Sequence, residues 1–204
     1  LLMKEHNILG VILAGGKSSR FGSNKSLSNL SNLKLIEHVI NKINKYFPEI
    51  LIVSNDNKLI LDDSNIKMIK DCKEGYLGPL VGVLSAMKYA NQNNKYNWIT
   101  TFPCDTPFFD ELIIEKMIQK TFSHKEKIFL IKEKKQRHNI FGTWSTNLEK
   151  ILEEDLNNNF RKVDLWADKI GCVYIEKDIK KENEFLNINT KEDLELAERI
   201  YSKK

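Results

Sequence analysis

The chain has 204 residues, 41% of them hydrophobic and 9% aromatic, which is typical of a globular protein and excludes a disordered one. Its 32 basic and 28 acidic residues leave a net charge of +4, and the lysines are spread along the chain, so a nucleic-acid-binding protein is disfavoured. At this length we expect one domain, residues 1–204, and no membrane span, since no apolar run approaches roughly 18 residues.

In the first half of the chain, short apolar segments alternate with amphipathic ones. Strands buried on both faces are predicted at residues 8–14, 50–53, 66–69 and 98–102. Helices are predicted between them and after them, at 36–47, 80–89 and 111–122. Strands separated by helical crossovers indicate a Rossmann-like, three-layer α/β/α fold with a mostly parallel sheet. In such sheets ligands bind beyond the carboxyl ends of the strands.

The second half of the chain is less regular. Strands are predicted at 128–131 and 172–175, and helices at 148–156 and 163–170. Thr190 and Asp193 have the spacing of a capping box, so a last helix is predicted up to residue 201. The charged run at 132–137 is interpreted as an exposed turn.

The cysteines and histidines do not form a metal-ligand pattern. Cys72, Cys104 and Cys172 are far apart in the sequence, and no CxxC pair is present, so neither a zinc site nor a disulfide framework is indicated. Free thiols are typical of a reducing cytoplasm, which is the expected location. Cys104 is interpreted as a small buried thiol rather than a nucleophile, because no base is positioned beside it.

A glycine turn follows the first predicted strand. Its sequence is LAGGKSSRFG at residues 13–22, and Lys25 lies just beyond. Gly15 and Gly16 allow consecutive backbone N–H groups to hold phosphate oxygens, and Arg20 and Lys25 supply the positive charge that a polyphosphate needs. The segment has neither the Walker A order nor the GxGxxG fingerprint, which disfavours a dehydrogenase. The alternative is an ordinary glycine-rich turn with solvated basic residues.

Asp105 follows another predicted strand and lies between two prolines. Pro103 and Pro107 stop both strand and helix from continuing, so the carboxylate is expected on a stiff turn at the sheet edge. One carboxylate facing a phosphate-binding loop suits Mg²⁺, which takes its other ligands from phosphates and water. The alternative is a helix-capping or turn aspartate.

Further polar and glycine positions lie at predicted strand or helix ends. An aspartate such as Asp71 can accept paired hydrogen bonds from guanine N1–H and the N2 amino group, or bind a ribose hydroxyl; Asn55 and Asp71 are equally typical of turns. Gly78 precedes a helix and would let a nucleoside lie against the backbone. Asn187 and Asn189 have the period-two spacing of one strand face, and the alternative is a capping turn.

Together these segments resemble the MobA-type molybdenum cofactor guanylyltransferases, within the wider family of sugar-phosphate and cofactor nucleotidyltransferases. The matching stretches lie in the family's order between Val11 and Leu194, and they read LAGGKSSRFG, MIKDCKEGYLGPLVGVLSAM, FPCDTP and FLNINTKEDL. The glycine turn alone indicates a nucleotidyltransferase. The combination of GPLVG, PCDTP and NINT favours the molybdopterin branch.

The resemblance implies a role for each of these positions. Nucleotide binding is implied for Leu13, Ala14, Gly15, Gly16, Lys25, Asn55, Asp71, Gly78 and Asp105. Asp105 is implied to bind Mg²⁺ as well, and Lys25, Arg20 and Asp105 are implied as the catalytic residues. Asn187 and Asn189 match an asparagine pair near the second substrate, and the stretch 125–184, with His138 and Arg161, is expected to shape the pterin side.

The implied activity is transfer of GMP from Mg-GTP to the terminal phosphate of molybdopterin, with release of pyrophosphate. GTP and molybdopterin are then the binding partners, beside transient contacts with other cofactor-biosynthesis proteins or recipient molybdoenzymes. Two alternatives are a related transferase, such as a molybdopterin cytidylyltransferase or a sugar-phosphate enzyme, and a non-catalytic carrier of nucleotide or pterin.

Overall fold

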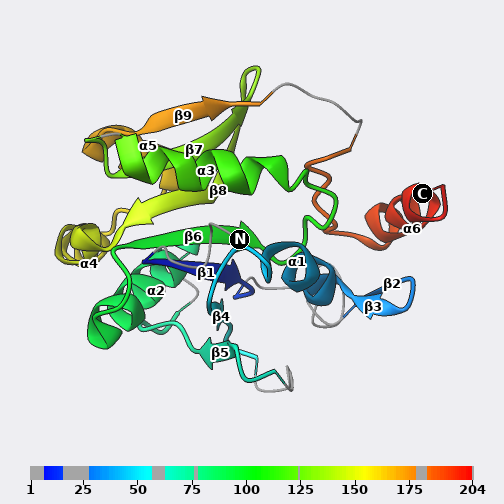
Figure 1. Ribbon diagram of the computed structural model, residues 1–204, viewed down its shortest axis with the longest axis horizontal. Coiled ribbons are helices and arrows are strands. Elements are labelled where there is room, and N and C mark those ends of the chain that lie inside the picture. Colours follow the sequence, from blue (N-terminus) through cyan, green and yellow to red (C-terminus); the bar gives the residue numbers. More distant parts are fainter. Residues whose placement is uncertain are drawn as a thin grey trace.

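The computed structural model describes residues 7–15, 28–56, 63–75, 78–123, 125–177 and 183–203. In these residues a sheet of seven strands has the order β5-β4-β1-β6-β8-β7-β9 (Figure 1). The strands are β1 (Ile8–Leu13), β4 (Ile50–Val53), β5 (Ile66–Ile69), β6 (Trp98–Pro103), β7 (Ile128–Glu133), β8 (Gln136–Ser145) and β9 (Val173–Glu176). Neighbouring strands are parallel except at β8, which runs antiparallel to both β6 and β7. The predicted mostly parallel sheet is confirmed.

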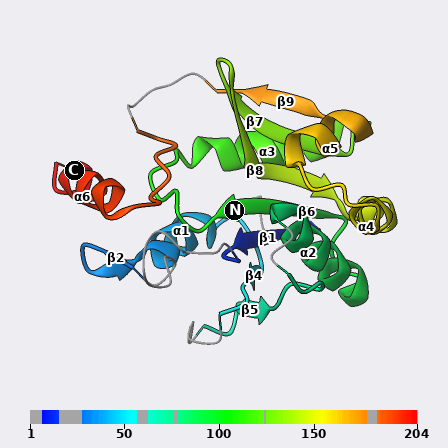
Figure 2. The ribbon, with the colours of Figure 1, turned by 180° about the vertical axis from the view of Figure 1, so that it is seen from behind.

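Helices cover both faces of the sheet (Figures 1 and 2). On one face, α1 (Leu35–Ile43) and α3 (Leu112–Ser123) form a core with Ile12, Phe102 and Phe129 from the strands. On the other face, α2 (Pro79–Asn93), α4 (Glu149–Asn157) and α5 (Val163–Ile170) pack on Val11, Ile99 and Trp144. The alternation of buried side chains along each strand therefore fills both cores and gives the three expected layers.

A third, smaller core lies at one end of the sheet. It consists of Leu30, Leu35, Phe108, Ile188 and Ala197, and we call it the end cluster. The end cluster joins the short hairpin β2–β3 (Asn29–Leu30, Leu33–Lys34) to the last helix, α6 (Lys191–Tyr201). These elements lie together in both views (Figures 1 and 2).

Most of the predicted elements are confirmed to within a few residues. The predicted capping box is present at the start of α6, where the Thr190 side chain accepts from the Asp193 N–H. The charged run at 132–137 is only partly a turn, because it also ends β7 and begins β8. Strand β8 and the hairpin β2–β3 had no counterpart among the predictions. A three-residue helix, Thr146–Leu148, separates β8 from α4. No helix in the described parts of the chain is long and apolar enough to cross a membrane.

Gly10 in the middle of β1 is required for close packing against Phe47, which follows α1 in the chain. A Cβ atom added there would lie 2.8 Å from a ring carbon of Phe47, which is 2% exposed. We expect Gly10→Ala to lower the free energy of unfolding by about 1–3 kcal/mol, because the ring has no open space to move into. Urea unfolding measures this change. In the Phe47→Leu background the same substitution should cost less, and an equal cost in both backgrounds would contradict the steric explanation.

Candidate active site

The carboxyl ends of four adjacent parallel strands, β5, β4, β1 and β6, form one edge of the sheet. Leu13 at the end of β1 is in register with Pro103 at the end of β6, and the Cys104 N–H donates to the Leu13 carbonyl at 3.4 Å. Ala14 and Gly15, the described start of the glycine turn, and the loop of Asp105 therefore leave the sheet side by side. That the glycine turn and Asp105 share a polyphosphate stays a prediction.

Asp71 lies close to the start of the glycine turn. A Cβ atom built on Gly15 would be 3.3 Å from the Asp71 Oδ2 atom, and one built on Gly82 would be 3.7 Å from Oδ1. The Asn55 amide donates to Asp71 Oδ2 at 2.7 Å, and the Asp71 N–H donates to the Asn55 side-chain oxygen at 3.1 Å. Asn55 therefore fixes the Asp71 carboxylate at the sheet edge, against glycines that have no side chains to cover it.

Burial raises the pKa of Asp71 above the ordinary value for aspartate, and the hydrogen bond from Asn55 partly offsets that rise. A half-buried carboxylate that has few hydrogen-bond donors around it is stabilised by a ligand that supplies N–H or O–H groups. The position is therefore suited to reading the donor edge of a base or a ribose hydroxyl.

Gly78 caps the N-terminus of α2, and its φ of 91° is favoured by glycine. Pro79 follows at the first helical position. A Cβ atom on Gly78 would be 3.8 Å from the Arg161 carbonyl, so Arg161 lies beside the start of α2. The guanidinium of Arg161 donates to the Phe160 carbonyl and to the Asn159 side chain, which places it in a turn after α4. Gly78 and Arg161 thus meet at the N-terminus of a long helix, where anions are favoured.

Asp105 is joined to the segment that contains the two asparagines. Its carbonyl accepts from the Ile188 N–H at 2.9 Å, and its Oδ1 accepts from the Thr106 hydroxyl at 3.2 Å. Ile188 is completely buried in the end cluster, whereas its neighbours Asn187 and Asn189 are exposed. The structure therefore anchors the asparagine pair beside the backbone of Asp105.

The carboxylates at this edge of the sheet decide which kind of metal ion the site can hold. Within the described ranges, no group of three His, Cys, Asp or Glu side chains could hold a metal. Asp105 supplies one half-buried carboxylate at the sheet edge, next to the glycine turn. This arrangement fits an ion such as Mg²⁺ that takes one or two carboxylates from the protein and its other ligands from phosphates and water. It does not fit a structural zinc site.

His138 lies at the amino end of β8, stacked on Phe185 with the ring centroids 3.8 Å apart. Its Nε2 atom is 3.3 Å from the Glu133 carboxylate. Burial lowers the pKa of His138 below the usual value for histidine, and the neighbouring Glu133 opposes this effect. The stacking on Phe185 gives His138 a structural role. Its contact with the second substrate remains a prediction.

Three of the predicted site residues, Gly16, Arg20 and Lys25, lie outside the described residues. Sequence reasoning missed a buried ionic cluster of Asp110, Lys177 and Glu184 at the same edge of the sheet. One signal was present, because Lys177 directly follows a strand, as Asp105 closely follows β6 and Asp71 closely follows β5. The pairing across the chain was not visible from the sequence. Cys104 is buried, and none of the three cysteines is in a disulfide.

The chain was compared with known proteins. Residues 10–166 match the family model described as the MobA-like NTP transferase domain. A molybdenum cofactor guanylyltransferase of Shewanella halifaxensis is 32% identical over 95% of this chain and 96% of its own. A protein of the same name from Yersinia pseudotuberculosis is 32% identical over 95% of this chain and 96% of its own.

Among solved structures, molybdopterin-guanine dinucleotide biosynthesis protein A from Archaeoglobus fulgidus is similar to this chain with a TM-score of 0.79. The match covers 96% of this chain and 100% of the other, with 23% sequence identity. At that identity the structural match supports the fold, and the sequence matches support the family.

Proposed function

Because the chain belongs to the family of MobA-like NTP transferase domains, we propose that it transfers GMP from GTP to molybdopterin to form the guanine dinucleotide cofactor. The observation that carries the proposal is the convergence of Gly15, Asp71 and Asp105 on one sheet edge. This edge offers a base-reading carboxylate, a glycine turn for phosphates and a carboxylate for a metal. It is the set of groups that nucleotidyl transfer requires.

On the nucleotide side, the Asp71 carboxylate accepts hydrogen bonds from the N1–H and the N2 amino group of guanine, and Asn55 holds that carboxylate in place. Leu13, Ala14 and Gly15 offer backbone groups at the end of β1, and Gly78 lets the nucleoside approach α2. Gly16, Arg20 and Lys25 continue the glycine turn and supply the N–H groups and positive charge for the triphosphate. A positive charge in this position stabilises the leaving pyrophosphate.

On the acceptor side, an oxygen of the terminal phosphate of molybdopterin attacks the α-phosphorus of GTP. The bond from the α-phosphorus to the bridging oxygen breaks, and pyrophosphate leaves with the electron pair. The attacking phosphate is already ionised at neutral pH, so no general base is needed and positioning dominates. Asn187 and Asn189 bind and orient this acceptor beside Asp105.

Asp105 is the residue that would hold the divalent ion, and we propose Mg²⁺ because its donor is a hard carboxylate oxygen. A bound Mg²⁺ would neutralise charge on the phosphate oxygens of GTP. The reduced state of Cys72, Cys104 and Cys172, none of which is in a disulfide, supports a location in the reducing cytoplasm. We further propose transient contacts with proteins that deliver the pterin or receive the finished cofactor.

The deciding experiment is a nucleotide panel with molybdopterin as the acceptor. We expect pyrophosphate release with Mg-GTP, and rates at least about 100-fold lower with Mg-CTP or Mg-ATP, since a hydrogen-bonded base pocket rejects bases with the wrong donors. Preference for CTP would make the protein a cytidylyltransferase. Binding of GTP without pyrophosphate release, in the presence of active molybdopterin, would instead support a carrier.

A further inference from the structure

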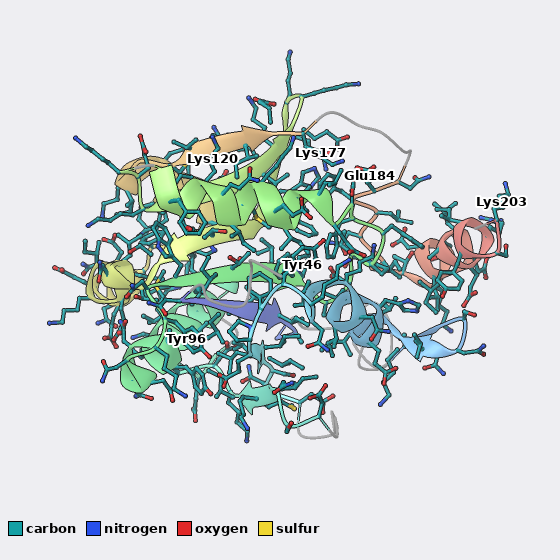
Figure 3. All side chains as sticks on the ribbon, viewed as in Figure 1. Tyr46, Tyr96, Lys120, Lys177, Glu184 and Lys203 are labelled. Atoms are coloured by element: carbon teal, nitrogen blue, oxygen red, sulfur yellow. The ribbon has the colours of Figure 1, made fainter. Side chains whose placement is uncertain are left out.

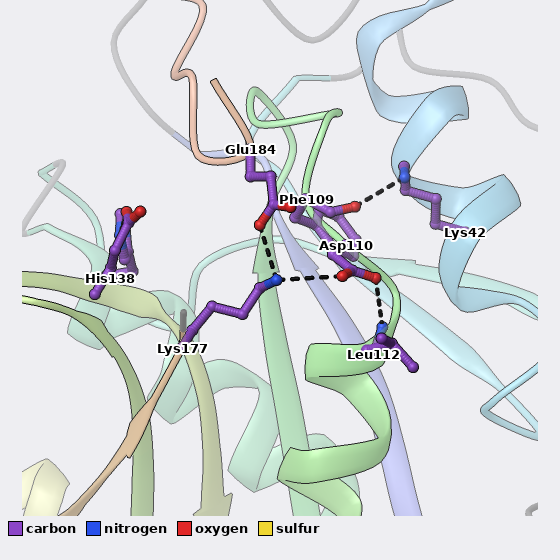
Figure 4. A network of polar contacts seen from close by, with 8 residues as sticks. Lys42, Phe109, Asp110, Leu112, His138, Lys177 and Glu184 are labelled. Carbon is purple, nitrogen blue, oxygen red and sulfur yellow. Dashed lines mark hydrogen bonds and ion pairs between the residues drawn. The ribbon is translucent and has the colours of Figure 1, made fainter. Parts of the chain in front are cut away.

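Lys177 carries a buried charge at the carboxyl end of β9. Its side chain is only 4% exposed, and its Nζ atom lies 2.8 Å from Glu184 Oε2 and 3.2 Å from Asp110 Oδ2. The Glu184 side chain is 5% exposed. Figure 3 labels Lys177 and Glu184, and Figure 4 shows the ammonium group between the two carboxylates. We call these three side chains the buried triad.

The two carboxylates of the buried triad come from the two segments that bear candidate site residues. Asp110 closes the loop that begins at Asp105, and it also accepts from the Leu112 N–H at the start of α3. Glu184 begins the segment that contains Asn187 and Asn189. Lys177 therefore joins the metal-binding side to the acceptor side at a distance from the chemistry.

The same two segments meet a second time, at the hydrogen bond from the Ile188 N–H to the Asp105 carbonyl. Between the two connections, Phe185 stacks on His138. On the other side, Lys42 of α1 donates to the Phe109 carbonyl at 2.8 Å, which fixes the Asp105 loop to the helical layer (Figure 4). The loop is thus fixed to α1, and the contacts that hold the segment at 183–190 to the loop include the triad, the backbone bond at Ile188 and the packing of Phe108 with Ile188 in the end cluster.

Burying the charges of Lys177 and Glu184, with Asp110 24% exposed beside them, is a poor way to gain stability, because desolvation offsets most of the attraction. Apolar side chains of similar size would serve a purely structural wall as well or better. An ionic contact, in contrast, selects one arrangement of the segments that it joins, because a buried charge that loses its partner is strongly destabilising. The carboxylates raise the pKa of Lys177 despite its burial, so the charge persists at neutral pH.

We propose that Lys177 is a positioning residue for the acceptor, holding the Asn187–Asn189 segment in register with Asp105 through Glu184 and Asp110. This inference rests on the proposed function for the identity of the acceptor. The geometry of the triad itself does not depend on that identity. Lys177 does not act on GTP, because Gly15 and Asp71 follow β1 and β5, and the strands β7, β8 and β6 lie between β9 and β1.

The test uses Lys177→Met, which leaves two buried carboxylates facing each other. Glu184→Gln is the milder variant, which keeps the side-chain shape and remains informative should Lys177→Met not fold. The matched control is Glu176→Gln. Glu176 directly precedes Lys177 and forms an exposed ion pair with Lys132, so its replacement perturbs the same strand end without touching the triad.

Hydrogen exchange of the Ile188 amide is the first readout, since that N–H reports directly on the contact with Asp105. We expect exchange at least about 10-fold faster in Lys177→Met, a smaller increase in Glu184→Gln, and no change in Glu176→Gln. The segment 66–75 should exchange as in the wild type in every variant. Unchanged Ile188 exchange in both triad variants would overturn the proposal.

Steady-state kinetics are the second readout. The KM for molybdopterin should rise about 10-fold in Lys177→Met, with the Kd for Mg-GTP within about twofold of the wild type. An equal loss of GTP affinity would indicate general disruption and overturn the positioning role. The proposed function and the positioning role of Lys177 can be refuted independently. If the wild-type protein does not transfer GMP, the proposed function is refuted, and hydrogen exchange at Ile188 still decides whether the triad holds the segment at 183–190.

Discussion

Replacing Asp105 with asparagine should lower the turnover number by about 100-fold or more, because an amide cannot supply the negative oxygen that a hard divalent ion requires. The substitution keeps the side-chain size, and the Thr106 hydroxyl can still donate to the remaining oxygen. The backbone bond from Ile188 is unaffected. The loss should therefore appear in kcat, with a higher requirement for Mg²⁺, and steady-state pyrophosphate release at several metal concentrations measures both.

Two further variants separate the carboxylate from its setting. Thr106→Val removes the hydroxyl that orients Asp105 Oδ1 and should cost less than about 10-fold, since a neutral hydrogen bond contributes about 1 kcal/mol. Asp63→Asn, in the turn that precedes β5, controls for the loss of one negative charge. Turnover of Asp105→Asn within a few-fold of the wild type would refute its role as the principal metal ligand.

Replacing Asp71 with asparagine should weaken binding of GTP by about 10- to 100-fold, the effect of losing hydrogen bonds to a charged acceptor. The Asn55 amide donates to Asp71 Oδ2 in the native protein. In Asp71→Asn, the new side chain can accept from Asn55 only with its amide oxygen. Its NH2 group then faces the N1–H and N2 amino group of guanine, which are also donors, so no hydrogen bond forms there. Titration of the variant with GTP in the presence of Mg²⁺ measures the change in Kd.

Analogues of GTP identify the group that Asp71 reads. Inosine triphosphate lacks the N2 amino group and should bind the wild type more weakly than GTP, whereas 2′-deoxy-GTP should bind almost as well. Asp71→Asn should reduce the difference between GTP and inosine triphosphate. Loss of discrimination at the ribose instead would assign Asp71 to the sugar, and unchanged GTP affinity would remove it from the pocket. The Asp63→Asn control applies here as well.

The central strands could be predicted from the sequence because burial on both faces leaves an unmistakable pattern. β1 and β4 are almost entirely apolar, and their ends were placed to within one residue. β8 was missed because its first residues are polar and exposed. In addition, residues 139–141 stand between positions paired with consecutive residues of β7, a bulge that interrupts the alternation.

The candidate site was predictable where a strand end carries a distinctive polar residue or glycine, as at Gly15, Asp71 and Asp105. What the sequence could not give is contact between segments far apart in the chain. Glu184 lies well beyond Asp110 in sequence, and neither residue stands in a motif. Only the folded chain shows that one lysine lies between both carboxylates.

The asparagine pair depends on Ile188, which belongs to the end cluster and not to the two large cores of the sheet. The proposed guanine site at Asn55 and Asp71, in contrast, lies just beyond the ends of β4 and β5, and α2 beside it packs in the core that contains Val11 and Ile99. We therefore expect natural variation in the end cluster to reshape the proposed acceptor side while the proposed guanine site is preserved. Descendants of one ancestral scaffold could thus acquire new acceptors without redesigning how they recognise the donor.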